Sequence, residues 1–219
     1  MRRAAGLFAA ALAVGTAALP SAARADLFSS LSYGVRASTI GDGVTLEKPL
    51  LYNFSVRVTT GTLSVTSQTA YDRTSYLSTQ HFNNFGVIAD FRPSAGRYRI
   101  SGGLVFGNDR IDNVSNPTGP LINVGTGTYP TNGAGQVLAR VAFNHPSIYA
   151  GVGTGAGIVR GLALDIDAGI LIRNGAASAG ATGPLSTNPA FQADLNRLQG
   201  ELRTRIIVPV ISLGLVYRP

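Results

Sequence analysis

The feature that most constrains this chain is a strict alternation of residue type over residues 162–173. Every second position is apolar, and the positions between them include Asp165, Asp167 and Arg173. Side chains two residues apart on a β-strand point to the same side, so a strand here has one apolar face and one charged face. A soluble β-sandwich would have to place such carboxylates in its core. A transmembrane β-barrel instead meets lipid outside and has a polar interior, which suits both faces.

Similar alternating segments of about ten residues recur along the chain. They cover residues 31–38, 43–50, 54–59, 85–92, 97–106, 141–153 and 207–218. Residues 43–50 give the weakest pattern, and residues 141–153 keep their phase only with a β-bulge near residues 144–146. Together with residues 162–173, these segments predict an all-β fold: an eight-stranded antiparallel transmembrane β-barrel.

The connections between these segments alternate in length. Residues 49–53, 93–96 and 156–160 are short, whereas residues 68–81, 108–137 and 174–204 are long. Bacterial barrels place short turns in the periplasm and long loops outside. This pattern predicts that both termini are periplasmic. Residues 108–137 are rich in Asn, Gly, Thr and Pro and are expected to form a mobile loop.

Residues 1–25 have the order of a secretory signal peptide. Two arginines are followed by an apolar run, Pro20 and the small-residue site Ala23-Arg24-Ala25. The run is too short for a membrane-spanning helix, the alternative interpretation. We therefore expect a cleaved signal at residues 1–25 and a single domain, the outer-membrane barrel of a Gram-negative bacterium, at residues 26–219.

The composition excludes several classes of protein. The chain has no cysteine, which removes disulfides, thiolate catalysis and cysteine metal sites. Without the signal, 15 basic residues stand against 11 acidic ones, a net charge of +4. This mild positive charge suits contact with anionic outer-membrane lipids and lipopolysaccharide. No basic stripe predicts nucleic-acid binding.

The last long connection contains a predicted helix. Asn188 can cap it and Pro189 can occupy its first position. An apolar stripe follows at helical spacing: Phe191, Leu195, Leu198 and Leu202. We expect a short helix in the last extracellular loop that folds back on the barrel rim or plugs its mouth. The alternative is a helix that docks a partner or lies on the membrane surface.

The strand phases direct a set of charged side chains into the barrel interior: Arg36, Glu47, Arg57, Asp90, Arg92, Arg99, Asp165 and Asp167. An eight-stranded barrel is only wide enough to be filled by side chains. Buried charges persist when they are paired, and here both signs are present. The sequence therefore predicts an arginine–carboxylate network that closes the interior. The alternative is a narrow or gated pathway for a small solute.

No pattern in the sequence predicts a catalytic, metal or cofactor site. The only histidines are His81 and His145, and a hydrolase would need a serine held beside one of them. Ser147 lies close to His145 in sequence, but Pro146 intervenes and no orienting motif surrounds the pair. We expect both histidines to be rim residues of a protein that is not an enzyme. A structural or surface-interaction role is favoured over a porin-like channel for small solutes or hydrophobic compounds, and over a lipid-modifying enzyme.

Much of the chain resembles a family of small bacterial outer-membrane β-barrel proteins, similar in architecture to outer membrane protein A. The resemblance rests on residues 54–57, 89–93, 98–103, 140–144, 149–153 and 167–169, on the loop helix, and most specifically on the ending VPVISLGLVYR at residues 208–218. It implies location in the cell outer membrane, assembly by the barrel-assembly machinery and no catalytic residues. Such chains usually end in an aromatic residue, whereas here Tyr217 precedes Arg218 and Pro219. We expect a monomer whose surface loops meet a partner that the sequence does not identify.

Overall fold

The fold was obtained as a computed structural model that describes residues 30–51, 53–71, 74–93, 97–116, 119–143, 146–202 and 205–219. The predicted signal peptide lies outside these residues. The strands are β1 (Ser32–Ser38), β2 (Gly43–Leu51), β3 (Phe54–Tyr71), β4 (Thr74–Phe91), β5 (Tyr98–Gly107), β6 (Asp109–Ser115), β7 (Leu121–Val124), β8 (Gly127–Pro130), β9 (Val137–Phe143), β10 (Ser147–Val159), β11 (Leu162–Asn174), β12 (Ala176–Ala181) and β13 (Arg205–Tyr217). The helices are α3 (Thr131–Ala134), the 3-10 helix η2 (Pro184–Thr187) and α4 (Pro189–Leu202).

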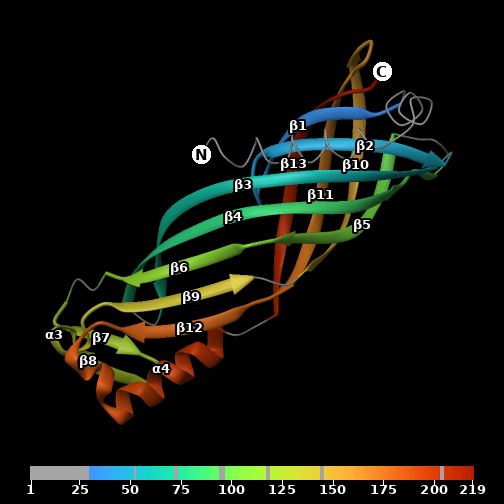
Figure 1. The fold of residues 1–219 in the computed structure, drawn as a ribbon. Coiled ribbons are helices and arrows are strands. Elements are labelled where there is room, and N and C mark those ends of the chain that lie inside the picture. The colour runs from blue at the N-terminus through green and yellow to red at the C-terminus, as the bar shows by residue number, and fades with distance from the viewer. Residues whose placement is uncertain are drawn as a thin grey trace, which may run out of the picture.

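Eight antiparallel strands close into a ring (Figure 1). The order around it is β4, β3, β2, β1, β13, β11, β10 and β5, and the pairing of β5 with β4 completes the circuit. Each ring strand overlaps one of the segments predicted from alternation, including the weak segment at residues 43–50. The turn predicted at residues 156–160 is shorter than expected. β10 runs to Val159, and Gly161 supplies the positive φ of 81° that the tight turn requires.

Alternation along the ring strands separates a charged interior from an apolar exterior, with the phase predicted from the sequence. On β11, Asp165, Asp167 and Leu171 are buried inside the ring, whereas Ile166 and Ile170 are exposed outside it. β13 has the same arrangement, with Ser212 buried and Ile211 and Leu213 exposed. The interior also contains a first hydrophobic core, formed by Ile40, Ile88, Val105, Tyr149, Leu171 and Val210. The ring therefore encloses both charged and apolar side chains, and its exterior is apolar.

Part of the wall continues beyond the ring as an extension formed by β6, β9, β12 and the distal halves of β3 and β4 (Figure 1). β4 pairs first with β5 and then with β6, so β6 prolongs β5. The long loops predicted at residues 68–81 and 108–137 are therefore wrong for most of their length. Residues 68–81 are rich in Ser and Thr, and residues 108–137 are rich in Asn, Gly, Thr and Pro. Neither segment shows the apolar alternation that predicts a strand, although threonine favours strands.

The segment 141–153 was predicted as one bulged strand, and this is wrong. Its first part belongs to β9, which pairs with β6 and β12 in the extension. Its second part belongs to β10, which pairs with β5 and β11 in the ring. Two strands with different neighbours explain why the apolar phase of the sequence changes there.

A second hydrophobic core lies against the extension, away from the ring. It joins α4 to β7, α3 and β9 through Ile122, Val124, Ala134, Val137, Phe191, Leu195 and Leu198, with Leu202 packed at its edge. Asn188 caps α4, because its Oδ1 accepts the amide of Ala190 at 2.9 Å. The predicted apolar stripe thus packs within this second core, which we call the apical core. Among the described residues, no helix is both long and apolar enough to cross a membrane.

Candidate functional site

The interior of the ring contains a buried ion-pair network centred on Arg57. This side chain of β3 lies between two carboxylates: its Nε is 2.9 Å from Asp90 Oδ2, and its Nη1 donates to Asp167 Oδ2 at 2.9 Å. The contact of Nε with Asp90 is an ion pair that lacks hydrogen-bond alignment. Asp90 also accepts the hydroxyl of Ser101. Arg57 therefore joins β3, β4 and β11 across the interior.

Arg99 extends this network from β5. Its Nε and Nη2 donate to Asp167 Oδ1 at 2.9 and 2.7 Å, and its Nη1 donates to Asp165 Oδ2 at 2.9 Å. Asp167 thus accepts bonds from two arginines, and Ser212 Oγ of β13 donates to it as well, at 3.3 Å. Such multiply bonded pairs suit burial, because each charge has several compensating contacts.

Gly153 on β10 makes room for these pairs. It lies in register with Arg99 on β5 and with Asp167 on β11, so the two charged side chains meet over it. A Cβ at this position would lie 2.2 Å from Asp167 Oδ1 and 2.8 Å from Arg99 Nε. Glycine is therefore required by the network itself. Gly155 has the same relation to Asp165, whose Oδ1 a Cβ there would approach to 2.6 Å.

A smaller cluster occupies the end of the ring that lies away from the extension. Glu47 Oε1 accepts the hydroxyl of Ser55 at 2.8 Å and pairs with Arg92. Arg92 also donates to Ser55 Oγ at 3.0 Å. Of the eight charged residues predicted to face the interior, seven are brought into carboxylate–arginine pairs in the described structure.

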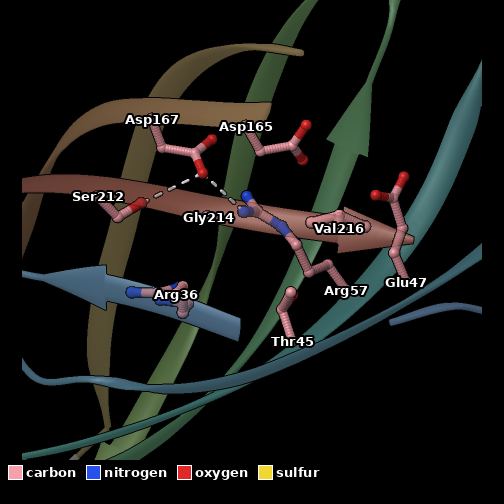
Figure 2. Close-up of a pocket in the computed structure, with 9 residues that line it drawn as sticks. All are labelled: Arg36, Thr45, Glu47, Arg57, Asp165, Asp167, Ser212, Gly214 and Val216. Carbon is pink, nitrogen blue, oxygen red and sulfur yellow. Dashed lines mark hydrogen bonds and ion pairs between the residues drawn. The ribbon is translucent and has the colours of Figure 1, made fainter. Parts of the chain in front are cut away.

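Arg36 is the exception. Among the described residues it has no carboxylate partner, and its Nη2 donates to Ser38 Oγ at 3.2 Å. Its side chain lies beside a cavity shown in Figure 2, where Thr45, Asp167 and Ser212 also line the wall. The volume of this cavity that the centre of a water molecule can occupy is about 10 Å³. That is the space for about one water.

Sequence reasoning missed three charged residues of the interior. Arg218 donates to Asp165 Oδ1 at 2.8 Å, and Arg173 donates to Asp109 Oδ2 at 2.6 Å. Arg173 falls on the same strand face as Asp165 and Asp167, and Arg218 falls on the same face as Ser212, so the alternation of the sequence could have identified both. Asp109 could not be placed, because its segment was taken as a loop.

The outer face of the extension has a polar cluster that the sequence did not predict. His81 lies within β4, not at the end of a strand, and its Nδ1 shares a hydrogen bond of 3.1 Å with Ser64 Oγ on β3. Its Nε2 is 3.9 Å from Asp112 Oδ2 on β6. His145 lies outside the described residues. Cross-strand register brings Ser64 beside His81, although 16 residues separate them in sequence, so local spacing gave no indication.

Asp112 also holds two arginines. The Nε atoms of Arg110 and Arg140 donate to its two carboxylate oxygens, the first at 3.0 Å. The two side chains remain 46% and 60% exposed. Burial opposes the ionisation of Asp112, but the hydrogen bonds from Arg140 and Arg110 outweigh it and lower the pKa of this carboxyl. We call Arg110, Asp112 and Arg140 the extension cluster.

Neither the ring interior nor the extension cluster has the donor set of a metal site. Within the part of the chain that the structure describes, no group of three or more His, Cys, Asp or Glu residues could hold a metal ion.

The fold is similar to that of solved proteins, although sequence comparisons find no relative. No protein-family model and no curated protein matches the chain. Acinetobacter baumannii CarO2 aligns with a TM-score of 0.63 at 10% identity, over 87% of this chain and 98% of that one. Acinetobacter baumannii CarO aligns with a TM-score of 0.58 at 16% identity, over 86% and 97%. These identities show a common fold and no more.

A third structure, a major outer membrane protein from Thermus thermophilus, aligns over 86% of this chain and 99% of that one. Its TM-score is 0.42 at 14% identity, too low for an inference about the fold. None of the three is outer membrane protein A, so the predicted likeness to that protein stays a prediction.

Proposed function

We propose that the chain is an integral β-barrel of the bacterial outer membrane, in which the ring spans the bilayer. The observation that carries this proposal is the exposed apolar exterior around an interior that contains buried ion pairs and a hydrophobic core. The outward apolar positions of β11 run from Leu162 to Ile172, roughly 33 Å along the strand. At the usual tilt this corresponds to about 25 Å of height, the apolar band of a bacterial barrel.

Aromatic side chains at both ends of this band support the proposal. Tyr33 packs on Tyr217 with ring centroids 5.4 Å apart, and Phe54 packs on Phe91 at 4.8 Å. At the opposite end Phe85 and Phe106 stack at 5.2 Å. Girdles of aromatic residues at the two interfaces are typical of transmembrane barrels.

The proposed orientation places the extension outside the cell and both termini in the periplasm. The C-terminus lies at the end of the ring opposite α4 (Figure 1). The short β2–β3, β4–β5 and β10–β11 turns lie at that end too, as periplasmic turns do. We further propose a cleaved signal at residues 1–25, assembly by the barrel-assembly machinery, and a monomer.

We propose a structural or surface-interaction role with a closed interior. The Arg57 and Arg99 pairs cross the ring, and the cavity beside Arg36 has room for about one water. The test is conductance of the purified protein in planar bilayers. We expect no stable, discrete conductance, and its appearance would favour the alternative of a small-solute channel. An Asp165→Arg/Asp167→Arg variant would then change that conductance.

We also propose that the Ser64–His81 pair is not catalytic. Acyl transfer needs hydrogen-bond donors that point at the developing oxyanion. The backbone amides around this pair already take part in the β3–β4 and β4–β6 strand pairing, so they do not form such a site. The test compares ester hydrolysis and membrane lipid profiles of the unmodified protein with those of Ser64→Ala. We expect no difference. Hydrolysis that is abolished by Ser64→Ala would establish a lipid-modifying enzyme instead.

A further inference from the structure

The extension cluster lies on the same face as the apolar band of the ring. β3 and β4 pair without a register shift from Phe54 to Tyr71, so Phe85 and His81 point to the same side. His81 is four residues beyond Phe85, about 13 Å along the strand. Arg110 pairs with His81 in register. In the orientation of the proposed function, on which this inference rests, the cluster lies just beyond the apolar band, at the level of the lipid headgroups.

Arg110 and Arg140 are arranged to bind an anion. One carboxylate fixes both guanidinium groups through their Nε atoms. Their Nη atoms make no hydrogen bond to another described residue. A guanidinium that is held at Nε keeps its outer N–H groups for a ligand, and the planar donor arrangement suits phosphate oxygens. The conformational cost of binding is low because Asp112 already orders both side chains.

A groove of about 510 Å³ begins at the cluster and continues away from the ring. Its lining contains the apolar residues Val114 and Leu138, the polar residues Asp112, Arg140 and Ser178, and Gly180. These residues lie in paired rows, with Asp112 beside Arg140 and Val114 beside Leu138. A Cβ at Gly180 would meet no atom within 4 Å, so the space above it is open. Sugar rings suit such a wall, because they have apolar C–H faces and hydroxyl edges.

The order of these zones along the strands identifies the kind of ligand. An apolar band comes first, then the arginines, then the groove with its apolar floor and Ser178. We propose that this face binds a phosphorylated glycolipid of the outer leaflet. Its acyl chains lie along the band near Phe85, a sugar phosphate contacts Arg110 and Arg140, and further sugars occupy the groove. A phospholipid with a small headgroup would leave the groove empty.

The test measures binding to the folded chain in neutral detergent, so that it does not depend on where the protein resides in the cell. The probes are diphosphorylated lipid A with core sugars, the same glycolipid after dephosphorylation, phosphatidylglycerol and inorganic phosphate. Arg110→Gln/Arg140→Gln is compared with Arg97→Gln/Arg160→Gln, two exposed arginines at the opposite end of the ring. The two double variants change the net charge equally.

We expect the phosphorylated glycolipid to bind at least tenfold more tightly than the other three probes. Arg110→Gln/Arg140→Gln should remove this preference, whereas the control double variant should keep it. Gly180→Leu, which fills the groove without a change in charge, should weaken glycolipid binding at least fivefold. Equal binding of phosphatidylglycerol or inorganic phosphate, or no effect of Gly180→Leu, would overturn the proposal. Insertion into lipid vesicles tests the proposed function separately.

Discussion

Gly153 offers the sharpest test of the buried network, because a single methyl group is directed at its centre. In Gly153→Ala the new Cβ would lie 2.2 Å from Asp167 Oδ1 and 2.8 Å from Arg99 Nε. Either separation is shorter than van der Waals contact, so Asp167 and Arg99 must move apart from the positions that give their 2.7 and 2.9 Å bonds. The backbone of Gly153 cannot yield easily, because both of its neighbouring strands are paired with it.

The expected cost follows from two known effects. Overpacking of a filled interior costs about 1–3 kcal/mol, and breaking a buried ion pair costs about 3–5 kcal/mol. We therefore expect Gly153→Ala to lower the free energy of unfolding by about 3 kcal/mol. With an m value of about 2 kcal/mol/M in urea, the unfolding midpoint falls by about 1.5 M.

The assay is urea unfolding of the protein in detergent micelles, followed by circular dichroism and tyrosine fluorescence, since the chain has no tryptophan. Gly157→Ala on the same strand is the matched control, because a Cβ there meets nothing within 4 Å. It should leave the midpoint unchanged or raise it slightly. If the two variants unfold at the same urea concentration, the argument that glycine makes room for the network is refuted.

Three further predictions concern the network and the apical core. Asp90→Asn should lower the free energy of unfolding by about 3 kcal/mol, since Arg57 loses one of two buried partners, and urea unfolding beside the exposed Asp42→Asn control measures this. Phe191→Ala should speed proteolysis of α4, because Phe191 is 0% exposed, while the urea midpoint of the ring stays the same. The hydrogen bond of 2.6 Å from Tyr129 to Asp194 raises the pKa of the phenol and lowers that of the carboxyl. Its stabilisation is therefore complete between about pH 4 and about pH 10 and is lost below and above that window; amide exchange in α4 should show both losses, and Tyr129→Phe should abolish the alkaline one.

Apolar alternation made the ring predictable from the sequence. The strand Leu162–Asn174 shows why. One of its faces is the apolar exterior and the other points into the ring interior, so a shift by one residue would place every side chain on the wrong face. The same phase brought Arg57, Asp90, Arg99, Asp165 and Asp167 to one side. Pairing among them followed from the narrowness of an eight-stranded ring, because unpaired charges there would be unstable.

The extension could not be predicted in this way. Its strands are exposed on one face, so Ser64, Thr66 and Thr79 are as suitable in a strand as in a loop. The extension cluster depends on register between β4, β6 and β9, and no local spacing reports that register. Arg36 shows the opposite limit: its phase was predictable, but its lack of an ion pair with a described carboxylate was not, because Glu47 and Asp167 line the same cavity and pair with other arginines.

The extension makes the molecule lopsided. The distal halves of β3 and β4 rise on one side together with β6, β9 and β12, whereas β1, β2 and β13 end at the rim (Figure 1). In the proposed membrane orientation, the protein would therefore have a tall side and a low side, and neighbouring molecules would meet a different surface on each. In that orientation, rotation about the bilayer normal would determine which of the two sides faces a neighbouring molecule, whereas a symmetric cylinder would present the same surface at every angle.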